Sequence, residues 1–446
     1  MPPKTPTAED HLRVLRDALK QSTPWTSGLL NVRPDELVLF YKHGAGEDDA
    51  RHLNFNDATE EQLARLAESC QPATFGKGTE DILDESYRKA GKLDCADFAA
   101  SLDVGTLRLV EAISPDLLDG RDDVEDKSIK AELYKLNVYG PGSFFKAHKD
   151  TPRAGDMIGS LVVVLPTAHS GGALTLSHGD SSTSFDSGAL LADKPSSIAY
   201  AAFFSDVTHA VEEVTSGYRV TLTYNLFLLD APTSRLVPGR QASAAETACE
   251  AALRALMADA TFLPAGGLLG FGLQHQYPVP RTPSDPASLE HVTTVLKGAD
   301  ARMQSAAARV GLESVIQLIY RSLEYYARGR DRGGNQVVLG EVIDLEGMWD
   351  EGGETSEAVE KAGEVLRTAR YSEIGVKPKK NSQPESESAG LEDEKRTAIF
   401  WVRRLTRLNR AESAFIAMGN QADLAHSYGD AALLVRFPPS GQRGAE

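Results

Sequence analysis

Two short polar motifs near the middle of the chain have the residue types of an open metal site. The first, His148-Lys-Asp150, lies at the end of a predicted strand at residues 143–149. Side chains two residues apart on a strand point to the same face, so His148 and Asp150 can reach one ion together. The second is built around a single histidine, His209, further along the chain. Two imidazoles and one carboxylate suit non-haem iron(II), because they leave open positions for other ligands. The sequence therefore predicts a metal site at His148, Asp150 and His209.

A competing His-x-Asp motif, His178-Gly-Asp180, lies in the sequence HGDSSTS, which is typical of a hairpin tip. The chain from His148 to His209 is long enough for several further strands, whereas the chain from His178 is too short for the same circuit. We therefore expect His178 and Asp180 to form a turn without a metal. His275 and Tyr277 have no accompanying carboxylate pattern, and we interpret them as structural.

An arginine is expected close to the metal. His209 and Arg219 stand on either side of a Thr-Ser-Gly turn, so we expect a hairpin that brings their side chains together. An arginine directed into a cavity needs a counter-anion, because an unpaired buried charge is costly. A dicarboxylate meets this need, since one end can pair with the guanidinium while the other end chelates the metal. Thr221 or Tyr139 could add a hydroxyl hydrogen bond.

These motifs resemble the prolyl 4-hydroxylase-like branch of the iron(II)- and 2-oxoglutarate-dependent dioxygenases. The resemblance covers about residues 80–228 and rests on DESYRKAGKLD, LYKLNVYGPGSFFKAHKDT, SGGALTL and HAVEEVTSGYRVTLTYNL. It implies that His148, Asp150 and His209 hold the iron, that Arg219 pairs with the distal carboxylate of 2-oxoglutarate, and that Tyr139 contacts this co-substrate. The strand at 161–165 is aliphatic where some relatives carry a second tyrosine, so a second co-substrate tyrosine stays undetermined.

The resemblance further implies a hydroxylase that uses Fe(II), O2 and 2-oxoglutarate as co-substrate, with ascorbate as an additional reductant. The expected substrate is a protein or peptide side chain, prolyl first, although a fold does not fix a substrate. Two alternatives stay open: an oxygenase that acts on a small molecule, and a catalytically silent β-helix that serves as a protein-binding scaffold. Nucleobase demethylation is disfavoured because Asn225 stands where those enzymes have a second arginine, and Arg219 disfavours a metal enzyme without 2-oxoglutarate.

The surrounding elements predict an α+β fold in three regions. Residues 1–125 form an N-terminal flanking region, mostly helical. Residues 126–235 form a double-stranded β-helix (jelly-roll) core, because many short strands alternate with glycine-rich turns. Residues 236–446 form an additional mixed α/β region of unknown role, with helices expected at 243–258, 300–328 and 356–370. A charged segment with serine and proline predicts a mobile loop at 376–396.

The composition narrows the choice of partners. The formal net charge of −17 argues against a nucleic-acid partner and is compatible with a basic protein partner. No apolar run reaches the length of a signal peptide or of a membrane span, so we expect a cytoplasmic or nuclear protein without a membrane contact. The three cysteines show no C-x-x-C spacing and are expected to be reduced thiols. The sequence determines neither the substrate's identity nor the oligomeric state.

Overall fold

The computed structural model describes residues 6–20, 23–44, 49–77, 80–121, 127–150, 155–230, 243–321, 336–350, 353–375, 396–418 and 422–443. The chain divides into two compact units. The first, here called the β-helix unit, comprises Thr23–Asp119 and Asp123–Val237. The other, here called the C-terminal unit, comprises Met1–Ser22, Gly120–Asp122 and Pro238–Glu446. The three-part division expected from the sequence stays a prediction, and the loop predicted at 376–396 lies, apart from its last residue, outside the described residues.

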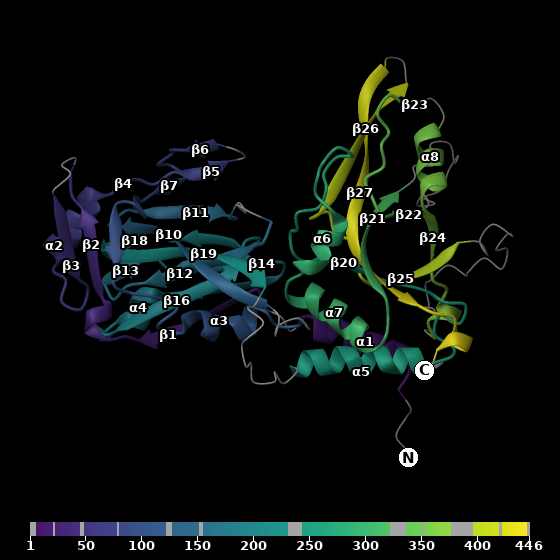
Figure 1. The fold of residues 1–446 in the computed structure, drawn as a ribbon, viewed down its shortest axis with the longest axis horizontal. Helices are drawn as coiled ribbons and strands as arrows, with labels where there is room; N and C mark the ends of the chain where they lie inside the picture. The colour runs from purple at the N-terminus through teal and green to yellow at the C-terminus, as the bar shows by residue number, and fades with distance from the viewer. Residues whose placement is uncertain are drawn as a thin grey trace. The chain divides into compact units, whose positions relative to one another are not determined.

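The β-helix unit is built on two antiparallel sheets (Figure 1). The larger sheet has seven strands, in the order β1 (Trp25–Asn31), β16 (Ser197–Phe204), β12 (Met157–Val164), β19 (Arg219–Asp230), β10 (Lys127–Tyr139), β8 (Gly91–Asp94) and β4 (Gln71–Pro72). The smaller sheet has five, in the order β15 (Ser181–Phe185), β14 (Leu174–His178), β17 (Thr208–Val211), β11 (Phe144–His148) and β7 (Arg88–Lys89). The predicted α+β class and jelly-roll core are confirmed.

Alternation along the central strands explains why the larger sheet has one apolar and one polar face. Val220, Leu222 and Leu226 on β19 are fully buried in the hydrophobic core of the β-helix unit. Residues 219, 221, 223 and 225 of the same strand point to the opposite face, where they line a cavity. The helices of the unit are α2 (Glu60–Ser69), α3 (Leu109–Leu117) and α4 (Ser187–Leu191).

Three smaller sheets complete the β-helix unit. They are β13 (His169–Gly171) with β18 (Val214–Gly217), β3 (Ala50–Asn54) with β2 (Val38–Lys42) and β9 (Phe98–Ala100), and β5 (Phe75–Lys77) with β6 (Glu80–Ile82). The hairpin predicted between the strands of His209 and Arg219 is wrong. β17 belongs to the smaller sheet and β19 to the larger one, because the intervening segment forms β18 and pairs with β13.

The C-terminal unit contains an eight-stranded sheet in the order β20 (Gly267–Gly272), β25 (Thr397–Arg403), β24 (Glu364–Thr368), β22 (Gln336–Leu339), β21 (Ser314–Arg321), β27 (Ala422–Phe437), β26 (Arg410–Met418) and β23 (Trp349–Asp350). β20 also pairs with β27, so the first six strands close into a ring. A small apolar cluster takes at least one residue from each of these six strands, which fits the interior of a barrel.

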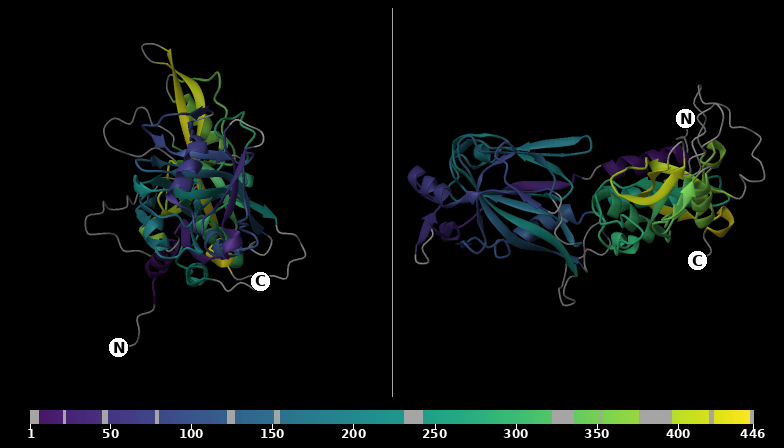
Figure 2. Two further views of the ribbon diagram at one scale, coloured as in Figure 1. Left: turned by 90° about the vertical axis from the view of Figure 1, so that its left-hand side faces the viewer. Right: turned by 90° about the horizontal axis from the view of Figure 1, so that it is seen from above.

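The helices of the C-terminal unit are α1 (Ala8–Lys20), α5 (Ala244–Ala258), α6 (Leu289–Thr294), α7 (Gly298–Arg309) and α8 (Glu354–Ala362). The N-terminal helix α1 packs along α5, and its Leu12, Leu15 and Leu19 join the apolar core of this unit (Figure 1, Figure 2). No helix among the described residues is long and apolar enough to cross a membrane.

Two helices of the C-terminal unit are shorter than predicted. The helix expected at 300–328 ends at Arg309, and β21 follows Gly311, whose φ of 74° stops the helix. The helix expected at 356–370 ends at Ala362, and β24 follows Gly363. In both cases a β-branched segment after a glycine pairs with a neighbouring strand, and this sheet pairing decides the local structure.

Candidate metal centre

The three predicted metal ligands come together in the β-helix unit. His148 is the last residue of β11, and its register partner on β17 is His209. Asp150 follows two residues after His148. One ligand atom from each residue lies within 4.8 Å of those of the other two, and His209 Nε2 is 3.6 Å from Asp150 Oδ1. The chain therefore places two imidazoles and a carboxylate where they could share one ion.

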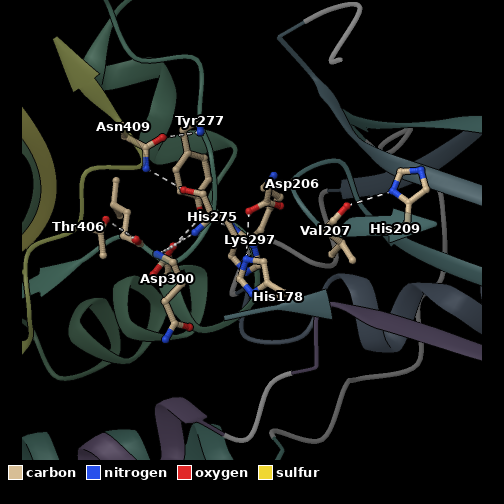
Figure 3. A network of polar contacts seen from close by, with 12 residues as sticks. His178, Asp206, Val207, His209, His275, Tyr277, Lys297, Asp300, Thr406 and Asn409 are labelled. Atoms are coloured by element: carbon tan, nitrogen blue, oxygen red, sulfur yellow. Dashed lines mark hydrogen bonds and ion pairs between the residues drawn. The ribbon is translucent and has the colours of Figure 1, made fainter. Parts of the chain in front are cut away.

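Backbone carbonyls orient both imidazole rings. His148 Nδ1 is 2.8 Å from the carbonyl oxygen of Lys146. His209 Nδ1 is 3.1 Å from the carbonyl oxygen of Val207, a contact shown in Figure 3. A carbonyl oxygen only accepts, so each Nδ1 carries the hydrogen and each Nε2 keeps a free lone pair. This is the arrangement by which proteins fix metal-binding histidines.

Asp150 is held by a neighbouring strand. Ser160 Oγ on β12 donates a hydrogen bond of 2.5 Å to Asp150 Oδ2. Oδ1, the other oxygen of the carboxylate, is the one that faces His209. Ser160 thus orients the carboxylate and leaves one oxygen directed towards the two imidazoles.

The surroundings of His148 favour a neutral ring. Burial, followed by the nearby His209, lowers its pKa from 6.5 to about 3. The ring of Phe145 stacks on His148 with centroids 3.5 Å apart, and Phe203 lies 4.7 Å from the ring of His209. Neutral imidazole is the form that binds metal ions, so this environment suits a metal ligand.

Arg219 is a buried cation with an unpaired nitrogen. Its side chain is 1% exposed, and its Nη2 has no hydrogen-bond partner among the described residues. Burial lowers its pKa to about 10, so it stays charged at neutral pH. Tyr139 is its register partner on β10, and the guanidinium carbon lies 5.6 Å from the centre of the tyrosine ring. A buried guanidinium with a free donor fits an anionic ligand.

A chain of hydrogen bonds positions Arg219. Its Nε donates to Ser187 Oγ at 3.3 Å, and Ser187 Oγ lies 3.2 Å from His169 Nε2. His169 Nδ1 is 2.8 Å from the carbonyl oxygen of Thr167, so Nδ1 carries the hydrogen and Nε2 accepts from the serine. Burial, then the charge of Arg219, lowers the pKa of His169, which keeps it in this neutral state.

A cavity of about 480 Å³ joins the two features. His148, Asp150 and His209 line it together with Arg219 and Thr221. Thr221 is 1% exposed, and Asn137 is its register partner on β10. An open metal site and an unpaired buried cation therefore lie in one cavity, whose volume falls within the roughly 300–1,000 Å³ of small-molecule sites.

Comparison with known proteins identifies the central part of this unit. Residues 134–227 match the 2OG-Fe(II) oxygenase superfamily. This segment is a 2OG-Fe(II) oxygenase domain. Enzymes of this superfamily are dioxygenases that use Fe(II), 2-oxoglutarate and O2, so the enzyme class, these three cofactors and the superfamily expected from the sequence are confirmed.

Similar solved structures include two prolyl hydroxylases. A prolyl-4-hydroxylase from Pseudomonas putida is 19% identical, with 48% of this chain and 98% of that chain covered and a TM-score of 0.29. A prolyl hydroxylase from Trichoplax adhaerens, solved with a peptide of hypoxia inducible factor, is 16% identical, with coverages of 51% and 94% and a TM-score of 0.29. No curated protein matches the chain.

The residues present in the oxygenase domain fit its cofactors. The donor set of two imidazoles and one carboxylate is that of non-haem iron(II) sites with open positions. The unpaired Nη2 of Arg219 is a donor that the described part of the protein leaves unused. A carboxylate of 2-oxoglutarate is the right partner for it, since guanidinium and carboxylate pair through two parallel hydrogen bonds.

The two competing candidates from the sequence lie elsewhere. His178 and Asp180 are not among the residues that line the cavity of the oxygenase domain. His178 ends β14 at the hairpin to β15, and its Nε2 is 3.3 Å from Asp206. In the C-terminal unit, the backbone of His275 and the hydroxyl of Tyr277 donate to the buried Asp300 (Figure 3).

Sequence reasoning missed several residues of this cavity. Arg88 on β7 is 4% exposed, and its guanidinium donates to Thr74 and to Asn137 Oδ1. The resemblance of residues 84–94 to the family was the available signal for it. Ser160 and Ser187 gave no signal, because a serine that orients a partner looks like any other serine in a strand or at a helix start.

Proposed function

We propose that the oxygenase domain hydroxylates a C–H bond of a protein or peptide substrate, with a prolyl side chain as the first choice. His148, Asp150 and His209 would hold iron(II), and Arg219 would bind the distal carboxylate of 2-oxoglutarate. The observation that carries this proposal is the shared cavity, in which an open metal triad and a buried arginine with a free donor lie together.

Bound iron with 2-oxoglutarate and O2 would supply the oxidising chemistry that the side chains of the protein lack. The protein's own groups bind and orient. The carbonyls of Lys146 and Val207 keep Nε2 of both histidines free. Asp150 cancels one positive charge of a divalent ion, and Phe145 and Phe203 shield the imidazoles from water. Tyr139 and Thr221 would contact the co-substrate next to Arg219; Tyr139 is the register partner of Arg219, and Thr221 lines the same cavity.

An aromatic wall supports a prolyl substrate. The rings of Phe75, Tyr87 and Phe145 line the cavity and contact one another, with centroids 4.5 Å apart for Phe75 and Tyr87 and 6.1 Å apart for Tyr87 and Phe145. Prolyl residues are commonly bound against aromatic side chains. Phe145 also stacks on His148, so a prolyl ring on this wall would lie beside the metal.

Metal titration tests the proposed ligands. Calorimetry with manganese(II) under nitrogen should give one site in the wild type. His148→Ala, Asp150→Ala and His209→Ala should each abolish this site, because two remaining ligands are too few for an open centre. His52→Ala, at an exposed position on β3, is the matched control and should bind like the wild type. Undiminished binding in one of the three variants would exclude that residue as a ligand.

Succinate release tests the activity. The wild type with iron(II), 2-oxoglutarate and a prolyl peptide should release succinate, and the three ligand variants should not. A wild type that binds neither metal nor 2-oxoglutarate would favour the alternative of a silent β-helix scaffold.

A further inference from the structure

A β-bulge shapes the wall of the cavity beyond the proposed metal ligands. Lys135, Asn137 and Tyr139 on β10 alternate into the cavity, as expected for a regular strand. Tyr134 lines it too, because the pairing of β10 with β19 shifts register between Leu133 and Lys135. Bulges of this kind redirect side chains next to active sites. Here the bulge places Lys135 Nζ over the ring of Tyr134, 4.2 Å from its centre.

A second lysine lies beside this pair. Lys92 on β8 lines the cavity, and its register partner on β10 is Asn137. Lys92 and Lys135 are therefore diagonal neighbours on one face of the sheet, with Cβ atoms roughly 7 Å apart. Lys92 Nζ already binds a carboxylate, that of Asp94 at 2.9 Å. The side chain of Asp94 is 50% exposed, and such an ion pair contributes at most about 1 kcal/mol, so a second carboxylate can join or replace it.

Among the described residues that line the cavity, cationic side chains outnumber carboxylates. The formal charges of bound iron(II), the 2-oxoglutarate dianion, Asp150 and Arg219 would sum to zero. In the described part of the lining, the remaining charged groups are the cations Arg88, Lys92, Lys135 and Lys149 and the carboxylate of Asp84. With Asp94 included, cations still outnumber carboxylates. This local excess is opposite in sign to the net charge of −17. Salt screens charges more than about 8 Å apart, so the nearby lysines dominate what the cavity attracts.

We propose that the substrate carries an acidic residue next to the residue that is oxidised, and that Lys92 and Lys135 bind its carboxylate. This inference rests on the proposed function and names the class of peptide that the site accepts. The ammonium group of Lys135 lies over the face of the Tyr134 ring, and both side chains line the cavity. We therefore expect an acidic peptide as the substrate, and not the basic partner with which the overall charge of the chain is compatible.

Broadening of peptide proton resonances by manganese(II) tests the inference. The probes are three acetylated hexapeptides with a central proline, flanked by glutamate, glutamine or lysine. Each is titrated into the full chain loaded with manganese(II) and 2-oxoglutarate under nitrogen. The glutamate peptide should bind about tenfold more tightly than the lysine peptide, since two ammonium groups contribute. This preference should shrink in 0.5 M salt, because exposed ion pairs are screened.

Charge reversal on one strand provides the matched comparison. Lys135→Glu should abolish or invert the preference, whereas Lys130→Glu should keep it, because Lys130 lies on the same strand, bonds to Glu132 and does not line the cavity. Lys92→Glu and Lys135→Gln repeat the test in case Lys135→Glu disturbs the bulge. Both should weaken the preference for the glutamate peptide.

The outcomes separate this inference from the proposed function. Three outcomes overturn the inference alone, provided that the wild type binds manganese(II) and 2-oxoglutarate. They are a preference for the lysine peptide, equal binding of the three peptides, and no broadening of the resonances of any peptide. A wild type that fails to bind manganese(II) or 2-oxoglutarate overturns the proposed function and the inference with it.

Discussion

Burial and backbone contacts set the pKa and the tautomer of two histidines in the oxygenase domain. His148 and His169 are both buried enough to lower their pKa, yet they serve different ends. His148 would offer a lone pair to a metal, whereas His169 accepts a hydrogen bond from the serine that orients Arg219. In both, a backbone carbonyl fixes the hydrogen on Nδ1, so the backbone determines which nitrogen is available.

The lowered pKa of His148 makes the stability of the metal-free protein depend on pH. The folded state keeps His148 neutral down to about pH 3, while the unfolded state takes up a proton below about 6.5. The unfolded state therefore binds more protons in this window, and stability falls as the pH falls. Between pH 8 and pH 5 this group should account for a loss of about 2 kcal/mol. Urea unfolding of the metal-free wild type and of His148→Gln should show a smaller loss in the variant, and equal losses would contradict the assigned burial.

At the scale of elements, the turn between β13 and β14 leaves the space that the side chain of Arg219 occupies. Gly172, between β13 and β14, has a φ of 69°, and a Cβ atom there would lie 3.0 Å from Cδ of Arg219 and 2.7 Å from Cγ2 of Val214. The Ser-Gly-Gly motif is thus needed both for the backbone conformation and for the space that Arg219 occupies.

Substitution at this turn should impair co-substrate binding at a distance from the metal. Gly172→Ala should displace the guanidinium and weaken 2-oxoglutarate about tenfold or more, while metal binding stays near normal. Gly179→Ala is the control, because Gly179 has a φ of 56° and a Cβ atom there would meet no atom of the described residues within 4 Å. Both variants carry a similar backbone strain of about 1–2 kcal/mol. Equal 2-oxoglutarate affinities in the two variants, measured by anaerobic calorimetry, would show that Gly172 does not set the position of Arg219.

The elements also show how far sequence reasoning reaches. His148, Asp150, His209 and Arg219 could be found because their chemistry is unusual and their strands alternate clearly. The placement of His209 and Arg219 on different sheets could not be predicted. The sequence of β18 is typical of a turn, and the segment forms a strand because it pairs with β13. The bulge at Tyr134 depends in the same way on the register of a strand about 90 residues away.

At the scale of the whole molecule, the two units have separate apolar cores. The core of the β-helix unit draws on residues from Val32 to Leu228, whereas α1 joins α5 in the core of the C-terminal unit. Neither the motifs nor the periodicity of residues 236–446 predicted the closed ring of strands. Its closure depends on β20 pairing with β27, two segments at opposite ends of that region.

Separate cores predict separate effects of core substitutions. Leu15→Ala in α1 removes a fully buried side chain and should destabilise the C-terminal unit by about 2–5 kcal/mol. Hydrogen exchange should rise in α5 and not in β10 or β19, and 2-oxoglutarate affinity should be unchanged. Val14→Ala, at a neighbouring position that is 42% exposed, is the control and should alter neither. A loss of 2-oxoglutarate affinity in Leu15→Ala would show that the cores are coupled.

The central claim is that Arg219 and the metal triad bind 2-oxoglutarate together. The most direct measurement is an anaerobic titration of 2-oxoglutarate into the iron(II)-loaded chain, followed by the metal-to-ligand charge-transfer absorption. Wild type should bind one equivalent. Arg219→Ala should keep its iron but bind 2-oxoglutarate roughly 30- to 700-fold more weakly, as about 2–4 kcal/mol are lost with the buried pair. Arg219→Lys should recover only part of the affinity for 2-oxoglutarate, because the point charge of an ammonium group does not reproduce the bidentate hydrogen bonds of a guanidinium. A wild type that never binds 2-oxoglutarate, or an Arg219→Ala variant that binds it equally well, would contradict the account.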